Sequence, residues 1–222
     1  YKRQGFKGVF AGSGAGLPKF MNIPGENLVG VMSSNEYLTR VNLMGAFSRD
    51  SETPVSRGRH VAVIGGGNTA MDSVRTAKRL GADRAMIVYR RSEEEMPARL
   101  EEVHHAKEED IDFLTLHNPI EYLNDGTGKV CAMRLQRMRL GEPDASGRRS
   151  PEPIEGDIIE IPVDEVIVSV GVSPNPLIPR TFKGLDVTRH GTIVVGENKQ
   201  SDLKDVFAGG AVSYTHLTLP TS

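Results

Sequence analysis

Residues 60–72 read HVAVIGGGNTAMD, and this stretch decides the fold. Its apolar run, VAVI at 61–64, is typical of a central parallel strand that is covered on both faces. Gly65, Gly67 and Ala70 fit the pattern G-x-G-x-x-A, in which the first glycine allows a tight turn and the second lets the backbone approach phosphates. The stretch predicts a strand, a turn and a helix that together bind the pyrophosphate of a dinucleotide.

The helix after the glycines is expected from about Asn68 to Leu80, because small and apolar residues recur there at helical spacing. Its first turn would present unpaired N–H groups and the positive end of the helix dipole to an anion. Gly81 is expected to end it as a C-cap glycine. The alternative is a glycine turn that only connects two elements of an α/β core. The position between an expected strand and an expected helix favours nucleotide binding.

Two arginines stand where an NAD-binding fold usually carries an acid. The second strand is expected over residues 84–89, and it ends about twenty residues past the glycines. Arg90 and Arg91 follow. A guanidinium suits a phosphate, whereas an acid there would repel the 2′-phosphate. The pair therefore favours NADP(H) over NAD(H), and the alternative is two solvated arginines that balance the glutamates at 93–95.

The composition is that of an ordinary globular protein. The chain has 222 residues, 38% hydrophobic and 25% charged, with a formal net charge of -2. We expect no nucleic-acid partner, because no dense basic patch occurs. No apolar run reaches the roughly 20 residues that cross a bilayer. Cys131 is the one cysteine, which excludes an internal disulfide or a C-x-x-C pair and favours a cytoplasmic setting. We expect it to be buried in a strand.

Both ends of the chain suggest a fragment. The sequence starts at Tyr1 without a methionine and soon enters a strand-like GVFA at 8–11. At the other end, residues 212–221 read VSYTHLTLPT, which resembles the translation of a sequencing adapter. We therefore expect residues 212–222 to be an artefactual tail.

The segment before the glycine fingerprint predicts a strand, a loop and a helix. A strand is expected at 9–11, and the glycine-rich loop 12–16 after it is expected to pass close to a ligand, because nearby prolines forbid a regular helix. Ser33 or Ser34 can cap a helix that runs to Leu43. Residues 48–58 are polar and suit a linker between domains.

The segment after the arginines predicts one further helix and mostly strands. The expected elements are a helix from Pro97 to Ala106, a strand at 112–116, hairpins over 120–161 with turns at 125–126 and 144–147, a buried strand at 163–170, two strands around 190–191, and a last strand at 206–208.

No residue is predicted to act as a catalytic group or as a metal ligand. His104 and His105 are adjacent on an expected helix and point about 100° apart, so they cannot chelate one metal together. We expect them at the surface or an interface. No Ser-His-Asp or Cys-His arrangement is suggested.

Several stretches together resemble one family, the small (β) subunit of NADPH-dependent glutamate synthase, and within it the branch with the large subunit of NADH-dependent ferredoxin:NADP oxidoreductase and a sulfide dehydrogenase subunit. The resemblance covers nearly all of residues 6–210, and YRRSEEEMPA is its most specific part. The stretches that carry it are GSGAGLPKFMNIPGENLVGV (12–31), SNEYLTRVNL (34–43), VAVIGGGNTAMDSVRTAKRLGA (61–82), VYRRSEEEMPARLEEVHHAKEE (88–109) and LGEPDASGRRSPEPIEG (140–156).

The resemblance implies an α/β flavoprotein with two dinucleotide-binding domains, in which a Rossmann-like NADPH domain is inserted in an FAD domain that is incomplete here. Residues 1–50 would end the first FAD segment, 55–168 would form the NADPH domain, and 169–211 would begin the second FAD segment, truncated.

The resemblance also implies site residues. Those implied at the pyrophosphate are Gly65, Gly67, Asn68, Thr69 and Ala70, and those at the 2′-phosphate are Arg90 and Arg91. Gly12 and Gly14 are implied near the flavin nucleotide. Gly171, Pro174 and Asn175 are implied near the nicotinamide, and Gly209 and Gly210 near the ribityl chain of the flavin.

The chain departs from the family at two points. Ala211 stands where the F-A-G-G-D motif has its aspartate, and the cysteines for iron–sulfur clusters lie outside the chain. By the resemblance, the parent passes hydride between NADPH and FAD, and electrons then reach iron–sulfur clusters and a partner subunit or a ferredoxin-type acceptor. The fragment alone is expected to be inactive.

The alternatives are a ferredoxin:NADP transhydrogenase or sulfide dehydrogenase subunit and, from another class, a module that binds NADP(H) without turning it over. A thioredoxin-reductase-type enzyme is disfavoured, because the nucleotide domain has no C-x-x-C.

Overall fold

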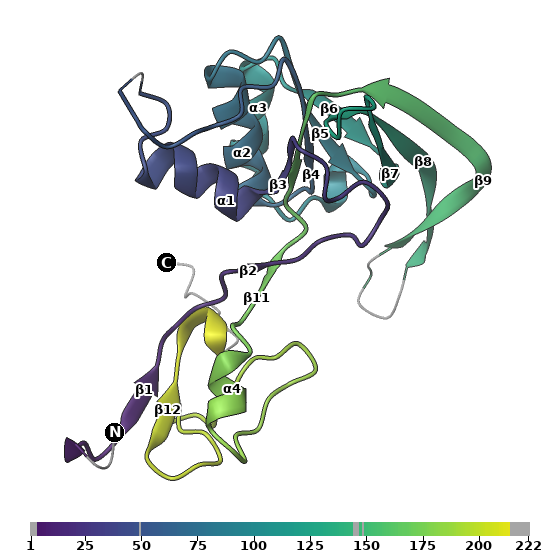
Figure 1. The fold of residues 1–222 in the computed structure, drawn as a ribbon. Coiled ribbons are helices and arrows are strands. Elements are labelled where there is room, and N and C mark those ends of the chain that lie inside the picture. Colours follow the sequence, from purple (N-terminus) through teal and green to yellow (C-terminus); the bar gives the residue numbers. More distant parts are fainter. Residues whose placement is uncertain (1–3, 49, 144–146, 148, 214–222) are drawn as a thin grey trace. The chain divides into compact units, whose positions relative to one another are not determined.

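The computed structural model describes residues 4–48, 50–143, 147 and 149–213 (Figure 1). The chain divides into two compact units. Unit 1 combines the two ends of the chain, Tyr1–Pro18 and Gly171–Ser222, and unit 2 is Lys19–Val170.

Unit 2 is built on a five-stranded sheet in which every neighbouring pair is parallel. In spatial order its strands are β3 (Val31–Ser33), β10 (Glu165–Val168), β4 (His60–Ile64), β5 (Arg84–Tyr89) and β6 (Asp112–Thr115). The last strand in sequence, β10, thus lies between β3 and β4. The central strands read as continuous apolar runs, because the sheet is covered on both faces.

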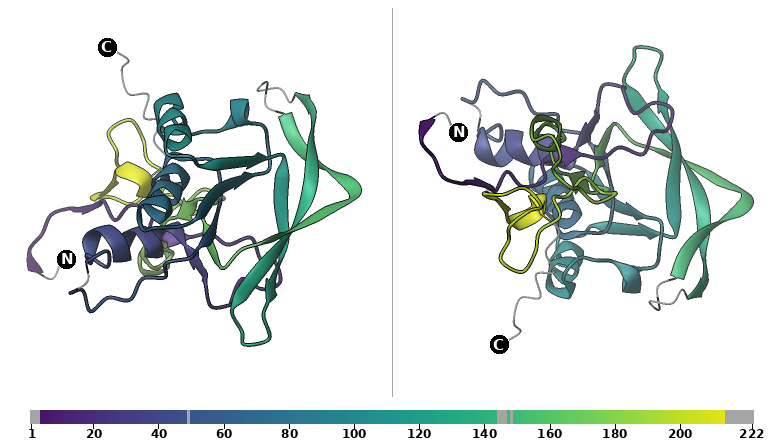
Figure 2. Two further views of the ribbon diagram at one scale, coloured as in Figure 1. Left: turned by 90° about the horizontal axis from the view of Figure 1, so that it is seen from above. Right: turned by 90° about the horizontal axis from the view of Figure 1, so that it is seen from below.

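Helices cover one face of this sheet (Figure 2). They are α1 (Ser34–Leu38) with its continuation as a π-helix, η2 (Thr39–Leu43), then α2 (Asn68–Arg79) and α3 (Leu100–Glu108). Val61 and Val63 of β4 point to this face and share a buried cluster with Met71 and Val74 of α2.

A three-stranded antiparallel sheet covers the opposite face (Figure 2). It consists of β7 (His117–Asn124), β8 (Val130–Pro143) and β9 (Arg149–Pro162). Ala62 and Ile64 of β4 point to it and pack with Met133 and Leu135 of β8. Alternate residues of one strand thus supply two cores.

Unit 1 is smaller. Strand β1 (Val9–Ala11) pairs parallel with β12 (Val206–Ala208), and β2 (Leu17–Pro18) pairs antiparallel with β11 (Val172–Ser173). Helix α4 (Leu177–Thr181) and the 3-10 turn η4 (Gly210–Val212) complete its named elements. Leu185, Ile193 and Val212 belong to its buried cluster.

The local predictions around the glycine fingerprint are confirmed. The expected strands 61–64 and 84–89 are β4 and β5, and the expected helix 68–80 is α2. Ser33 Oγ accepts the N–H of Glu36 at the start of α1, as the capping prediction required. His104 and His105 are exposed on α3.

The compact units divide elsewhere than the sequence predicts. Residues 19–50 fold with unit 2, because β3 pairs with β10 and Tyr37 of α1 is buried among residues of β4 and α2. Residues 48–58 consequently lie within unit 2 and are not a linker between the units. The boundary expected near residue 50 falls at 18/19.

Two smaller predictions also differ, and the prediction of an artefactual tail stays a prediction. The two strands expected around His190 reduce to an isolated antiparallel bridge between Val187 and Ile193. Cys131 lies in β8 as predicted but is exposed, because the buried side chains on either side of it point inward. Of the expected artefactual tail, Val212 is buried in unit 1, and residues 214–222 lie outside the described residues. Most of the second predicted hairpin turn, 144–147, also lies outside them.

Candidate functional site: the glycine turn and the arginine loop of unit 2

The first glycine of the fingerprint occupies a position that only glycine fits. Gly65 has a φ of +140°, and a Cβ there would lie 2.3 Å from the carbonyl oxygen of Ser169. The Ser169 N–H in turn donates to the carbonyl of Ile64 over 2.8 Å. The glycine turn therefore sits at the carboxyl ends of β4 and β10, where open α/β sheets bind their ligands.

The third glycine leaves its surroundings open. A Cβ at Gly67 would meet no atom within 4 Å, and Gly67 is the N-cap of α2 without any side-chain capping bond. An uncapped helix start with open space in front of it can receive an anion. Ala70, by contrast, is fully buried, so its small side chain lets α2 pack closely on the sheet.

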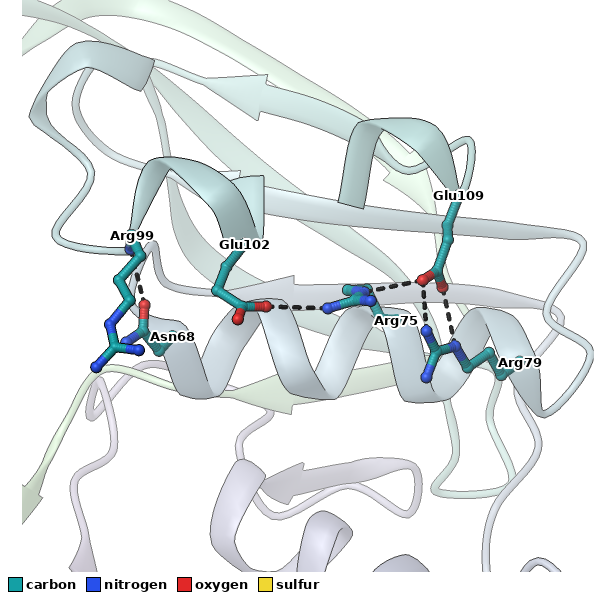
Figure 3. A network of polar contacts seen from close by, with 6 residues as sticks. All are labelled: Asn68, Arg75, Arg79, Arg99, Glu102 and Glu109. Atoms are coloured by element: carbon teal, nitrogen blue, oxygen red, sulfur yellow. Dashed lines mark hydrogen bonds and ion pairs between the residues drawn. The ribbon is translucent and has the colours of Figure 1, made fainter. Parts of the chain in front are cut away.

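The loop after β5 is fastened to this turn. A Cβ at Gly66 would lie 2.9 Å from the ring of Tyr89, and the Ala98 N–H donates to the carbonyl of Gly66 over 3.1 Å. The Arg99 N–H donates to Oδ1 of Asn68 over 2.9 Å (Figure 3). These contacts hold the segment from Tyr89 to Arg99, called here the arginine loop, beside the start of α2.

Arg90 and Arg91 begin the arginine loop. Arg90 is exposed and Arg91 is half-buried. Arg91 Nε donates to the carbonyl oxygen of Arg149 over 3.1 Å. Neither arginine forms an ion pair with a carboxylate of the described residues, so their charges are available to an anion.

The arginines of α2 have carboxylate partners on α3 and at its end. Arg75 meets Glu102 and Glu109 at 2.9 Å each, and Arg79 meets Glu109 at 2.6 Å (Figure 3). Burial alone would raise the pKa of Glu109, but the hydrogen bonds from Arg79 and Arg75 lower it below its usual value. Burial, followed by the charge of Glu102, raises the pKa of Asp72. This network joins the two helices and leaves little free charge.

A buried acid in β10 escaped the sequence analysis. Glu165 is fully buried, its Oε2 accepts the Gly58 N–H over 2.7 Å, and its Oε1 has no partner among the described residues. Burial raises its pKa, with a further contribution from the charge of Asp164. It pairs with Val61 at the amino end of β4, away from the glycine turn. The sequence gives no sign of this buried acid, because a single glutamate in an apolar strand matches no functional motif.

The predicted residues of unit 1 form a second group. Because Ala11 pairs in register with Ala208, the loops that follow β1 and β12 lie at one edge, and these loops hold Gly12, Gly14, Gly209 and Gly210. The Gly209 N–H donates to the carbonyl of Ala11 over 3.2 Å.

The remaining predicted residues of unit 1 lie between the end of unit 2 and α4. Gly171 has a φ of +107° and open space around it, and Pro174 is buried. Asn175 Oδ1 accepts the N–H of Leu177 over 3.0 Å at the start of α4. Gly171 thus lies directly before β11, and Pro174 and Asn175 lie directly after it.

The part of the chain that the structure describes has no metal-binding cluster and no membrane-spanning helix. No group of three or more His, Cys, Asp or Glu side chains there could hold a metal ion. No described helix is both long and apolar enough to cross a membrane.

The family model for pyridine nucleotide–disulphide oxidoreductases matches residues 3–221. The chain belongs to this family. Membership agrees with the expected NADP(H) and FAD cofactors and with an oxidoreductase fold.

Curated relatives of the chain include a glutamate synthase subunit and an iron-reducing enzyme's subunit. It is 38% identical over 205 residues to a glutamate synthase [NADPH] small chain of Halomonas elongata, across 89% of this chain and 43% of that protein. It is 36% identical over 241 residues to the NADPH-Fe(3+) oxidoreductase subunit beta of Geobacter sulfurreducens, across 98% of this chain and 35% of that protein. The chain therefore spans less than half of these relatives.

Solved structures confirm the predicted fold class. FprA from Mycobacterium tuberculosis in complex with NADPH matches with a TM-score of 0.75 at 20% identity, over 94% of this chain and 58% of that one. Thioredoxin reductase of T. acidophilum matches with a TM-score of 0.68 at 19% identity, over 95% and 59%. At such identities the likeness concerns the fold alone.

Proposed function

We propose that unit 2 is the NADPH-binding domain of a subunit that takes hydride from NADPH, in a protein longer than this chain. The single observation that carries the proposal is the glycine turn together with two arginines, at the end of the neighbouring strand, that have no carboxylate partner among the described residues. Gly65, Gly67, Asn68, Thr69 and Ala70 would hold the pyrophosphate, and Arg90 with Arg91 would hold the 2′-phosphate.

The arrangement favours a phosphorylated nucleotide for electrostatic reasons. A 2′-phosphate brings up to two negative charges. In the part of the chain that the structure describes, the two guanidinium groups have no carboxylate partner, so they can receive the phosphate without breaking an ion pair there. The Asn68 side chain at the start of α2 accepts the Arg99 backbone N–H and so fastens the arginine loop to this helix.

Unit 1 would be the part of an FAD domain that this chain contains. The glycine loops after β1 and β12 share one edge, which suits a backbone that approaches a flavin nucleotide. The fit is partial, because Ala211 replaces the motif's aspartate and the chain carries only one cysteine for any cluster. FAD accepts the hydride in such enzymes, and the residues of this chain would position the nicotinamide nucleotide. We infer no catalytic side chain.

For the whole protein we favour the small subunit of an NADPH-dependent glutamate synthase, with electrons leaving through iron–sulfur clusters to a partner subunit. The 38% identity to a relative of that name supports this. The second candidate is a subunit that reduces a ferredoxin-type or metal acceptor, which the relative named NADPH-Fe(3+) oxidoreductase subunit beta supports. A cytoplasmic setting stays a prediction.

The proposal is tested by nucleotide binding to the chain as it stands. We expect NADPH to bind more tightly than NADH in isothermal titration calorimetry. Hydrogen bonds to a charged group contribute about 1.5–3 kcal/mol each, so the double variant Arg90→Ala/Arg91→Ala should lose at least about tenfold in affinity for NADPH and little for NADH.

The matched control removes two arginines elsewhere in unit 2. Arg134→Ala/Arg139→Ala takes the same charge from β8, where both side chains pair with glutamates. This control should keep the preference for NADPH. Equal losses for both nucleotides in the arginine-loop variant, or a wild-type chain without a preference, would contradict the proposal.

A further inference from the structure

Arg149 meets the arginine loop through both its backbone and its side chain. It is the first residue of β9, far from the loop in sequence. Its carbonyl oxygen accepts from Arg91 Nε over 3.1 Å, and its own Nε donates to Glu95 Oε1 over 3.1 Å. Two bonds therefore fix this third arginine beside Arg91.

Glu95 has a second partner besides Arg149. Its Oε2 accepts from both the N–H and the hydroxyl of Ser92, in a capping box that starts the short helix η3 (Glu93–Glu95). Its side chain is only 15% exposed, whereas that of Arg149 is 39% exposed. The Glu95 carboxylate that bonds Nε of Arg149 is therefore more shielded from solvent than the Arg149 side chain itself.

The charges around this point do not cancel. Arg90, Arg91 and Arg149 bring three positive charges, and Glu95 offsets one of them. Glu94 lies 3.9 Å from Arg149, but it is 86% exposed, so solvent screens this pair. Arg91 bonds the backbone of Arg149, and the Glu95 carboxylate bonds the side chain of Arg149, not that of Arg91, so a bound dianion would offset the positive charge that remains here.

We propose that Arg149 is a third cation of the site for the phosphate ester on the adenine ribose, and so a determinant of the preference for NADP(H) over NAD(H). The inference rests on the proposed function of unit 2. The antiparallel sheet that covers the parallel sheet would then supply part of the nucleotide site, through the first residue of β9.

The test uses the 222-residue chain with NADPH and NADH as probes. Arg149→Ala should weaken NADPH binding by about tenfold, the loss expected for one hydrogen bond to a charged group, and should change NADH binding by less than about twofold. Arg149→Lys keeps the charge but loses the planar fork of donors, so its NADPH affinity should lie between those of the wild type and Arg149→Ala.

Arg134→Ala is the control on the same pair of strands. Arg134 donates from Nε to Glu160 over 3.2 Å, so its removal also breaks an arginine–glutamate pair, and NADPH affinity should stay unchanged. An unchanged NADPH affinity in Arg149→Ala, or equal losses for both nucleotides, would overturn the inference and make Arg149 a structural tether only. In those cases the arginine-pair variant still reports separately on the proposed function. A wild-type chain without preference overturns both.

Discussion

The arginines of α2 and those of the arginine loop have opposite surroundings. Arg75 and Arg79 each meet Glu109, and Arg75 also meets Glu102, within 2.9 Å (Figure 3). Arg90 and Arg91 have no carboxylate partner among the described residues. A paired arginine joins two helices, and an unpaired one beside a glycine turn is free for a ligand. The same residue type therefore joins two helices in one place and, in the proposed function, serves recognition in the other.

The largest difference in stability between the two regions is expected when Arg75 is removed. Arg75→Ala leaves the carboxylates of Glu102 and Glu109 without their shared donor, and both are less than one-third exposed. We expect the free energy of unfolding to fall by about 1.5–3 kcal/mol in urea denaturation, the usual contribution of hydrogen bonds to charged groups. The ratio of NADPH to NADH affinity should stay the same, and a change in that ratio would show that the α2–α3 network also positions the nucleotide site.

Acid should weaken the α2–α3 network by a smaller amount. Because the pKa of Glu109 is lowered in the folded chain, its contribution is present above the unfolded value of about 4.5 and is lost as the pH falls through the folded value. The stability difference between the wild type and Glu109→Gln should thus be largest near neutral pH and shrink below about pH 4.5 in urea titrations. A difference that stays constant over this range would argue against the ion pairs as its source.

The smallest effect on stability is expected at the arginine loop. Arg90→Ala removes an exposed side chain that meets no carboxylate of the described residues, so the free energy of unfolding should change by less than about 0.5 kcal/mol. Loss of repulsion between the charges of Arg90 and Arg91 would shift this free energy toward greater stability. A clear destabilisation in thermal unfolding would mean that Arg90 supports the fold, and the contrast with Arg75 would fail.

The sequence predicted the parts of the fold that depend on neighbouring residues. The apolar run of β4, the glycine turn, α2 and β5 are encoded by spacing within about thirty residues, and the structure matches them closely. The glycine and arginine positions of the candidate site follow from the same short stretch. The short strand β3 was missed, because its pairing with β10 joins Val31 to Val166 across most of the chain.

That missed pairing explains the displaced domain boundary. Local composition marked residues 48–58 as a linker, but a loop with proline and glycine can equally lie inside a domain when the strands on both sides of it join one sheet. Arg149 escaped notice for the same reason, since its contacts with Arg91 and Glu95 span 58 and 54 residues. No periodic pattern in the sequence predicts contacts between residues so far apart.

The place of β10 in the sheet has a consequence for the order in which unit 2 can form. The strands β4, β5 and β6 are neighbours in both sequence and space, so they can assemble while the chain emerges. Strand β3 borders only β10 within this sheet, and it must wait for residues 165–168, which come more than a hundred positions later. Closing so distant a contact is slow compared with local pairing. The carboxyl end of β10, against which Gly65 turns, arrives in that same late step, so the glycine turn takes its final shape only when the sheet is completed.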